Sequence, residues 1–303
     1  MRIFETRNKE EGPVKKQMKK KTLAAAAVLV AGAVYYLAGG PGTTAEPRTD
    51  NPEPVTTEVP ASKTKKSSGT TAAVGLEIPA SAGAGRIVKH GAYVSSYNTE
   101  TLIPDWVAYE LTAEEASGRR GRDGIEFKMD PDLRGCTQAM REDYSGSGWT
   151  KGHLMPAADA ATSSSTFEET FYFTNICPQN EVLNAGDWQF LEKKVRSWAK
   201  RYGSIFVVTG PIVDQNRYGT IGDRDVVVPD AFYKALLVRR DDGSYSSIAF
   251  VMGNDDDRYF LKDCKMTVDD LENMTGFDFF PGLDDKIEEK VESKIKLSDW
   301  GIK

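Results

Sequence analysis

A change in composition near residue 85 most constrains what this chain can fold into. Residues 41–85 are rich in Gly, Pro, Thr, Ser and Ala and hold almost no large apolar side chain. Such a segment buries too little apolar surface to offset the conformational entropy lost on folding. We therefore expect a disordered linker over 41–85 and one folded domain over 86–303, a length that suits a single domain.

We expect the first 40 residues to act as an export signal or as a membrane anchor. Residues 1–22 carry eight Lys and Arg against three Asp and Glu, and an apolar run, Leu23 to Ala38, follows. A basic flank before a short apolar run is typical of an export signal, or of a membrane anchor if it stays uncleaved. The sequence thus predicts an exported protein that is secreted, periplasmic or anchored, with its folded domain outside the cytoplasm.

Charge and cysteine content limit the partners and chemistry of the folded part. The chain has a net charge of −6, and since residues 1–22 contribute +5, the remainder carries −11. Nucleic-acid binders are usually basic, so any such function here must rest on local positive charge and a metal ion. The three cysteines, Cys136, Cys177 and Cys264, lack zinc-site spacing and permit one disulfide whose pairing the sequence does not fix. Cys177, at the end of an apolar run, is expected to be a buried free thiol.

The order of apolar patterns predicts an α+β fold, a mostly antiparallel sheet core flanked by helices. Alternating or continuous apolar runs indicate strands, and 3.6-residue periodicity indicates helices. The expected strands cover 89–97, 105–111, 171–176, 205–211, 225–228, 232–238 and 246–252, and the expected helices cover 184–201, 285–296 and a segment opening at 267–272.

A histidine in a polar, glycine-flanked turn is the main candidate for catalysis. His153 lies between Gly152 and Pro156, and the chain holds two histidines in all. Phosphodiester hydrolysis needs a base that activates water, and the unperturbed histidine pKa near 6.5 suits that task. We expect His153 to be this base. The other histidine, His90, lacks ionisable or metal-ligating company and is expected to be structural.

Four further side chains are candidates for substrate contact. Lys151 offers a point charge to a phosphate and Arg122 a bidentate fork, although either could be solvated surface charge. Asn175 and Gln179 flank a strand end and could contact substrate or hydrogen-bond the histidine loop. Plain turn structure explains these two equally well.

A helix opening at Asn184 is the candidate metal-binding element. The amide oxygen of Asn184 suits Mg²⁺, or Mn²⁺ as a substitute, because Mg²⁺ keeps several waters and takes few protein ligands. Asn184 could instead cap the helix. Glu192 would lie about 80° around and about 12 Å along an ideal helix, so it could reach the water shell of the ion but not share direct coordination. A salt bridge with Arg196 is the alternative for Glu192.

At these residues the chain resembles the DNA/RNA non-specific endonuclease family, the ββα-metal nucleases that include secreted bacterial nucleases and mitochondrial endonuclease G. The resemblance covers roughly residues 90–282 and includes 105–109, 144–148, the His153 motif with 156–159, 174–179, Asn184-x-x-x-Trp188-x-x-Leu191-Glu192, 208–211 and 275–280. It implies a ββα-metal active-site motif within the α+β fold. It further implies His153 as general base, Asn184 as the sole direct protein ligand of one Mg²⁺, and Glu192 as an acid acting through metal-bound water.

One motif departs from the family pattern. The family usually has Asp-Arg-Gly-His where this chain has Thr150-Lys151-Gly152-His153. Lysine keeps the charge but not the fork, and the missing Asp removes an acceptor that could steady the loop. The family's upstream arginine is best matched by Arg122, with Arg119 and Arg120 as rivals.

The leading hypothesis is a Mg²⁺-dependent endonuclease acting on DNA and RNA and leaving 5′-phosphates. A phosphodiesterase on small nucleotides could use the same residues. A degenerate surface-binding module of the same fold is a third reading, favoured by the Thr150-Lys151 change and the acidic charge. The membrane is a further partner if the N-terminal segment stays uncleaved, and the oligomeric state is not fixed by the sequence.

Overall fold

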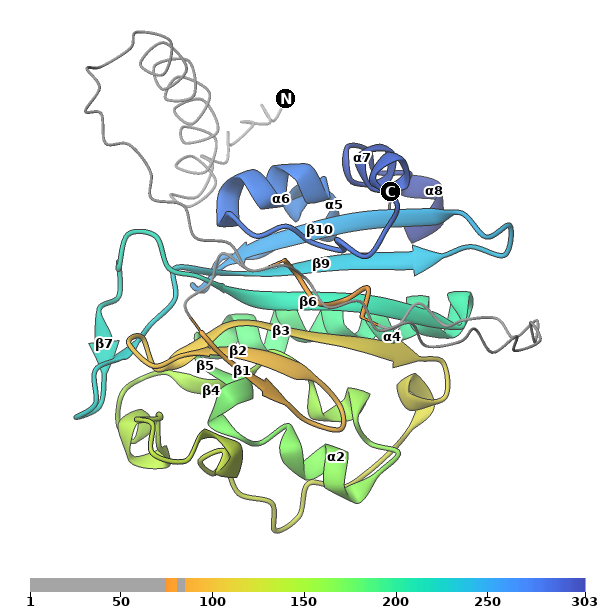
Figure 1. Cartoon of the computed structure of the whole chain (residues 1–303). Helices are drawn as coiled ribbons and strands as arrows, with labels where there is room; N and C mark the ends of the chain where they lie inside the picture. Colours follow the sequence, from red (N-terminus) through yellow and green to blue (C-terminus); the bar gives the residue numbers. More distant parts are fainter. Residues whose placement is uncertain (1–74, 81–84, 303) are drawn as a thin grey trace, which may run out of the picture. The chain divides into compact units, whose positions relative to one another are not determined.

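A seven-stranded antiparallel sheet organises the part of the chain that the computed structural model describes, residues 75–80 and 85–302 (Figure 1). Its strand order is β1-β2-β3-β6-β9-β10-β11. The strands are β1 (Arg86–Lys89), β2 (Val94–Asn98), β3 (Ile103–Thr112), β6 (Ser204–Ile212), β9 (Ala231–Arg239), β10 (Tyr245–Gly253) and β11 (Lys265–Met266). Two small antiparallel pairs stand apart from it: β4 (Thr150–His153) with β5 (Ile176–Gln179), and β7 (Thr220–Ile221) with β8 (Val226–Val227).

The middle strands are apolar because both faces of the sheet are covered there. In β9 every residue from Ala231 to Val238 is buried, and β6 and β10 are buried along almost their whole length. At the edge, β1 is mostly exposed. Strands buried on both faces read as continuous apolar runs, which is why β6, β9 and β10 were recognisable from sequence.

Helices cover the sheet at two places. The long helix α4 (Gln189–Tyr202) packs on β3, β6 and β9, and α5 to α7 pack on β10 (Figure 1). The α-helices are α2 (Ser164–Glu169), α3 (Glu181–Leu183), α4, α5 (Leu261–Cys264), α6 (Val268–Thr275), α7 (Asp285–Glu292) and α8 (Leu297–Trp300). Short 3-10 turns are η1 (Glu115–Ser117), η2 (Pro131–Leu133), η3 (Arg141–Tyr144), η4 (Ala157–Asp159) and η5 (Phe173–Asn175), and η6 (Asn184–Trp188) is a π-helical turn.

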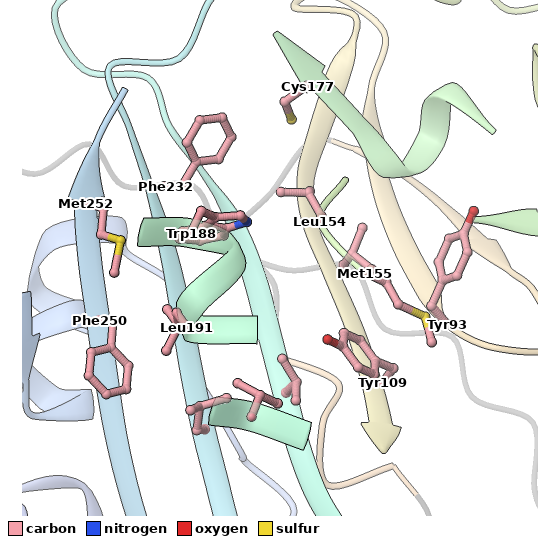
Figure 2. Close-up of a cluster of buried hydrophobic side chains, with 14 of the residues drawn as sticks. Tyr93, Tyr109, Leu154, Met155, Cys177, Trp188, Leu191, Phe232, Phe250 and Met252 are labelled. Carbon is pink, nitrogen blue, oxygen red and sulfur yellow. The ribbon is translucent and has the colours of Figure 1, made fainter. Parts of the chain in front are cut away.

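One apolar core joins the sheet, α4 and the segment that follows β4. Trp188 packs on Phe232 with ring centroids 5.6 Å apart, and Leu191 lies beside them (Figure 2). Leu154 and Met155, the two residues after His153, belong to the same cluster. Burial of these neighbours fixes the backbone on which His153 stands.

The α+β fold with a mostly antiparallel sheet and flanking helices is confirmed, while four elements differ from expectation. The helix expected over 285–296 ends at Glu292. The strand expected over 89–97 is two strands joined by a turn. The aromatic run 171–176 is mainly the turn η5, because the fully buried Phe171 and Phe173 fill the core instead of lining a pleated strand. The helix expected over 184–201 starts with the π-helical turn η6.

The N-terminal expectations fall mostly outside the described residues. The apolar run 23–38 and most of the linker 41–85 are not described. Of the linker, residues 75–80 contact the folded part: Leu76 is buried, and Ala80 N donates to the Asp278 carbonyl (2.9 Å). Among the described residues, no helix is both long enough and apolar enough to cross a membrane.

The three cysteines are free thiols. Cys177 is fully buried in β5, as the sequence predicts, and burial raises the pKa of its thiol well above the ordinary value. Its position therefore suits packing rather than thiolate chemistry.

Candidate active site

Two short strands and the helix that follows them form the frame of the site. β4 pairs antiparallel with β5, so that His153 lies opposite Ile176 and Thr150 opposite Gln179. The chain leaves β5 and enters α3, η6 and α4 directly. In this β-β-α order His153 ends β4, while Asn184 lies on the helical segment that follows β5, next to Thr150 at the start of β4.

Position 152 of this ribbon requires glycine, because the Gln179 side chain lies very close to it. A Cβ at position 152 would lie 2.6 Å from the Cβ of Gln179 on the paired strand. Real Cβ atoms do not come so close, so only glycine lets β5 pass at this distance. The side-chain amide of Gln179 is buried over Gly152 and makes no hydrogen bond within the described residues.

His153 lies against aromatic rings. Its imidazole is 5.4 Å from the Phe127 ring and 5.1 Å, edge to face, from the Phe171 ring, measured between centroids. Nε2 is closed off from solvent and has no hydrogen-bond partner in the described structure. This burial, reinforced by the charge of Arg122, lowers the pKa of His153 to about 3. The imidazole is therefore neutral at physiological pH and able to accept a proton.

Two cations lie over aromatic rings here and share the Phe127 ring with His153. The Arg122 guanidinium carbon lies 5.1 Å from the Phe127 centroid and 4.9 Å from that of Phe171. Lys151 Nζ lies 5.7 Å from Phe127 and 5.0 Å from Tyr144. Aromatic faces attract cations, so the rings hold Arg122 and Lys151 beside His153. The result is a local positive site on an acidic protein.

A hydrogen bond to Thr150 of β4 positions the Asn184 side chain. Its Nδ2 donates to Thr150 Oγ1 (2.9 Å), and that hydroxyl donates in turn to the Gln179 carbonyl (2.8 Å). Asn184 Oδ1 makes no hydrogen bond within the described residues and is the amide atom left for a ligand. The absence of Asp at position 150 was expected to cost the histidine loop an acceptor; the Thr150 hydroxyl accepts a hydrogen bond from Asn184 instead.

The helix cap is Asn180 rather than Asn184. Asn180 Oδ1 accepts hydrogen bonds from the amides of Val182 (2.8 Å) and Leu183 (3.3 Å). Asn184 belongs to the π-helical turn η6, a type of turn that is frequent at functional sites. Because η6 departs from 3.6 residues per turn, the 80° and 12 Å expected between Asn184 and Glu192 do not describe this segment.

Glu192 lies in a buried network of charges. The groups that act on it are Lys234 from β9, Asp159 from η4, and Arg196 and Lys193 from α4. Burial raises the pKa of Glu192 to about 7, against the opposing effect of Lys234. The alternative, a salt bridge between Glu192 and Arg196, does not form among the described residues: Arg196 pairs with Asp159 instead (2.7 Å).

Lys234 joins this network to the histidine loop. Its fully buried Nζ donates to the carbonyl of Leu154 (3.0 Å) and to Thr209 Oγ1 (3.1 Å), and it lies 4.7 Å from the Trp188 ring centroid. Burial lowers the pKa of Lys234 to about 8. One side chain thereby touches the residue after His153 and acts electrostatically on Glu192.

Asn175 holds the histidine loop from the other side. Its Oδ1 accepts from the amide of Met155 (2.8 Å), and its Nδ2 donates to the carbonyls of Met155 (2.9 Å) and Thr170 (2.8 Å). Its backbone carbonyl accepts from the amide of Leu154 (2.9 Å). Asn175 is fully buried, so its side chain faces the loop and not solvent.

His90 has acidic company, contrary to the sequence expectation. Its Nε2 lies 2.7 Å from Asp130 Oδ2 and its Nδ1 lies 3.9 Å from Asp132 Oδ2. His90, Asp130 and Asp132 offer ligand atoms close enough for a metal ion. Asp130 Oδ2 also accepts from Thr174 Oγ1 (2.6 Å), next to Asn175. The pairing spans about 40 residues of chain, which no local pattern reveals.

The structure brings together His153, Lys151 and Arg122 around shared rings, and Asn184 with Thr150. Lys234, which hydrogen-bonds the histidine loop, also acts electrostatically on Glu192. Sequence analysis missed the aromatic pair Phe127 and Phe171, and Lys234 itself. A lysine inside the apolar run 231–238 was the available signal, because a buried lysine demands partners.

Comparisons with known proteins identify relatives of this chain. The model of the DNA/RNA non-specific endonuclease family matches residues 68–286. The chain is similar to mitochondrial nuclease EXOG of Xenopus laevis (37% identity; 62% of this chain, 56% of the relative) and to mitochondrial endonuclease G of Bos taurus (30% identity; 68% and 76%). It is also similar to nuclease C1 of Cunninghamella echinulata var. echinulata (34% identity; 64% and 82%). The match thus spans little more than half the length of the Xenopus relative.

A solved structure shares the fold. The crystal structure described as the EndoG/EndoGI complex, which concerns EndoG inhibition, superposes with a TM-score of 0.61 at 28% identity. The match covers 67% of this chain and 89% of that one. The β-β-α frame therefore lies in a fold that a named nuclease also has.

The expectation of an exported protein is wrong. The Xenopus and Bos relatives, and others from Homo sapiens and Schizosaccharomyces pombe, are named as mitochondrial nucleases. Secretion and a membrane partnership find no support in these comparisons. A basic flank followed by an apolar run does not indicate which membrane the segment is directed to. The sequence therefore did not justify the prediction of export.

Proposed function

We propose that this chain, which belongs to the DNA/RNA non-specific endonuclease family, is a metal-dependent endonuclease that hydrolyses phosphodiester bonds of DNA and RNA. The observation that carries the proposal is the neutral imidazole of His153, held on aromatic rings beside two cations. A proton acceptor next to fixed positive charge is what attack of water on a phosphate requires.

The residues present fit Mg²⁺. Within the described part of the chain, Asn184 Oδ1 is a neutral oxygen without a hydrogen-bond partner. Its amide is oriented by Thr150, and the Glu192 carboxyl lies on the helix beyond it. Such a sparse oxygen set suits an ion that keeps most of its waters, with Mn²⁺ as a substitute. A bound ion would neutralise charge that develops on the phosphate and on the leaving oxygen.

The side chains around the ion have distinct tasks. His153 accepts the proton of the attacking water; with Nε2 closed off, Nδ1 is the nitrogen left to receive it. Arg122 and Lys151 bind the phosphate and hold it in line. Departure of the 3′ oxygen leaves the phosphate on the 5′ end of the product.

Glu192, Asn175 and Gln179 act by positioning in this proposal. Ionised Glu192 would order water around a bound ion. Asn175, whose amide is used entirely on backbone groups, and buried Gln179 keep the histidine loop in place instead of touching substrate.

The test is cleavage of supercoiled plasmid and of a long RNA by the full-length chain, with Mg²⁺ and with EDTA. We expect cutting of both polymers with Mg²⁺, none with EDTA, and 5′-phosphate ends. Arg122→Ala should cut more slowly, whereas Arg134→Ala, an exposed arginine elsewhere, should match the native rate. Absence of cutting with every divalent ion tried would overturn the proposal.

A further inference from the structure

Three carboxylates from two C-terminal helices meet beside β10. Asp269 and Glu272 lie on α6 and Glu292 ends α7, and one ligand oxygen from each lies within 4.8 Å of the others. Both helices pack on β10, which β6 and β9 separate from β3 in the sheet. The cluster is thus distinct from the His153 site, which is built on the β4–β5 ribbon beside β3.

Glu292 is the member that demands an explanation. The residue is only 4% exposed, and its Oε1 is shut off from solvent without a hydrogen-bond partner in the described structure. It is the last residue of α7, where the negative end of the helix dipole disfavours a carboxylate. A buried carboxylate with no partner is costly unless a cation or a proton compensates it.

Among the described residues, Glu292 forms no ion pair with a basic side chain. The charged groups that act most strongly on Glu292 are all acidic: Glu272, Glu288, Asp269 and Asp278. Burial, followed by these like charges, raises the pKa of Glu292 to about 9. The pKa of Glu272 rises to about 7 from the same causes, although its Oε1 accepts from the amide of Phe279 (2.8 Å).

We propose that Asp269, Glu272 and Glu292 form a structural binding site for a divalent cation of the Ca²⁺ type, which ties α7 to α6. Ca²⁺ accepts irregular sets of carboxylate oxygens at about 2.3–2.6 Å. The three ligand atoms lie close enough together to share one ion. Mg²⁺ demands near-ideal octahedral geometry and keeps several waters, so a site made of protein carboxylates alone suits Ca²⁺ better.

The competing explanation is a cluster that shares protons. In that case the carboxyls stay neutral, and the raised pKa values make the protein lose stability as pH rises from the ordinary glutamate range through the values of the folded state. A cation reverses this dependence, because it binds the ionised carboxylates and stabilises the folded chain more as pH rises.

The experiment is Ca²⁺ titration of the metal-free full-length protein at neutral pH, followed by calorimetry and by the unfolding temperature. We expect saturable binding and a rise in unfolding temperature. Glu292→Gln should weaken this binding at least about tenfold, the lower end of what loss of even an outer partner costs a metal site. Asp263→Asn, an exposed acid on α5, is the matched control and should bind as the native protein does.

Two further comparisons keep the test decisive. Without metal, Glu292→Gln should unfold no earlier than the native chain, because glutamine mimics the protonated acid. Asn184→Ala should retain the Ca²⁺ stabilisation, since Asn184 lies in the other site. The proposal fails if Ca²⁺ does not stabilise the native protein, if Glu292→Gln binds equally well, or if Asn184→Ala alone abolishes the stabilisation.

Discussion

At the residue scale, burial sets the charge of each group that the proposed chemistry needs. Aromatic rings and Arg122 hold the pKa of His153 at about 3, so this base is uncharged far below neutral pH. Glu192 behaves in the opposite way, since burial raises its pKa to about 7. The group that limits activity on the acid side should therefore be the carboxyl and not the imidazole.

The pH dependence of cleavage tests this assignment. As the pH falls through about 7, Glu192 takes up a proton and stops ordering metal-bound water, so kcat/KM should fall. Measured from pH 5 to 9, Glu192→Gln should be slower throughout and lack this limb. Glu181→Gln, an exposed acid on α3, should keep the native profile. An unchanged limb in Glu192→Gln would refute the assignment.

Lys234 should tune that same limb. Replacing it by Met removes the charge that opposes the rise in the Glu192 pKa, so the acid limb should move to higher pH. Loss of a buried charge partner should also cost about 3 kcal/mol of unfolding free energy. Lys193→Met, an exposed lysine near Glu192, is the control and should shift the limb less. A Lys234→Met profile identical to the native one would show that Lys234 only packs.

At the element scale, one hydrogen bond couples the β4–β5 ribbon to the π-helical turn. Thr150→Val removes the acceptor for Asn184 Nδ2 while keeping the side-chain volume. The Mg²⁺ concentration for half-maximal activity should then rise about 10–100-fold, as for other outer partners of metal ligands. Thr150→Ser retains the hydroxyl and should stay near the native value. Equal Mg²⁺ dependence in both variants would contradict this coupling.

Periodicity predicted the elements that pack along their length. The apolar spacing from Trp188 to Ala199 correctly identified the buried face of α4. The apolar spacing could not predict η6, because a single π-helical turn between two helices leaves no repeating pattern in the sequence. The aromatic run 171–176 has strand-like composition, yet its backbone bonds form turns and its rings fill the core.

The same limit applies to the site. Residue chemistry indicated His153, Lys151, Arg122, Asn184 and Glu192 as a group. Their surroundings, including Phe127 and Lys234, come from segments distant in sequence, and no local pattern predicts such contacts. Thr150 is an example. From the sequence, the residue was expected only to lack the carboxylate acceptor of an Asp, whereas in the structure its hydroxyl accepts a hydrogen bond from Asn184 Nδ2.

At the scale of the whole molecule, the C-terminal helix closes the core. Trp300 of α8 meets Trp198 of α4 edge to face with centroids 5.0 Å apart, and Trp198 Nε1 donates to the Trp300 carbonyl (3.0 Å). Trp300→Ala should lower the free energy of unfolding by about 3–5 kcal/mol. Leu297→Ala, a more exposed position on the same helix, should cost far less. Denaturant unfolding measures both, and equal losses would contradict the packing argument.

Charge also acts at this scale. The chain is acidic overall, yet Arg122 and Lys151 gather at the His153 ribbon, and the excess acid includes the cluster beside β10. The net charge alone argued against a nucleic-acid substrate. The distribution of the charges removes this objection, because the positive side chains lie at the candidate site.

The most direct test of the central claim is the rate of Mg²⁺-dependent plasmid cleavage by His153→Ala beside the native chain. Loss of a general base predicts a fall of about 10²–10⁴-fold, with the unfolding temperature showing that the variant is folded. A folded His153→Ala variant that cuts plasmid at the native rate would contradict the account.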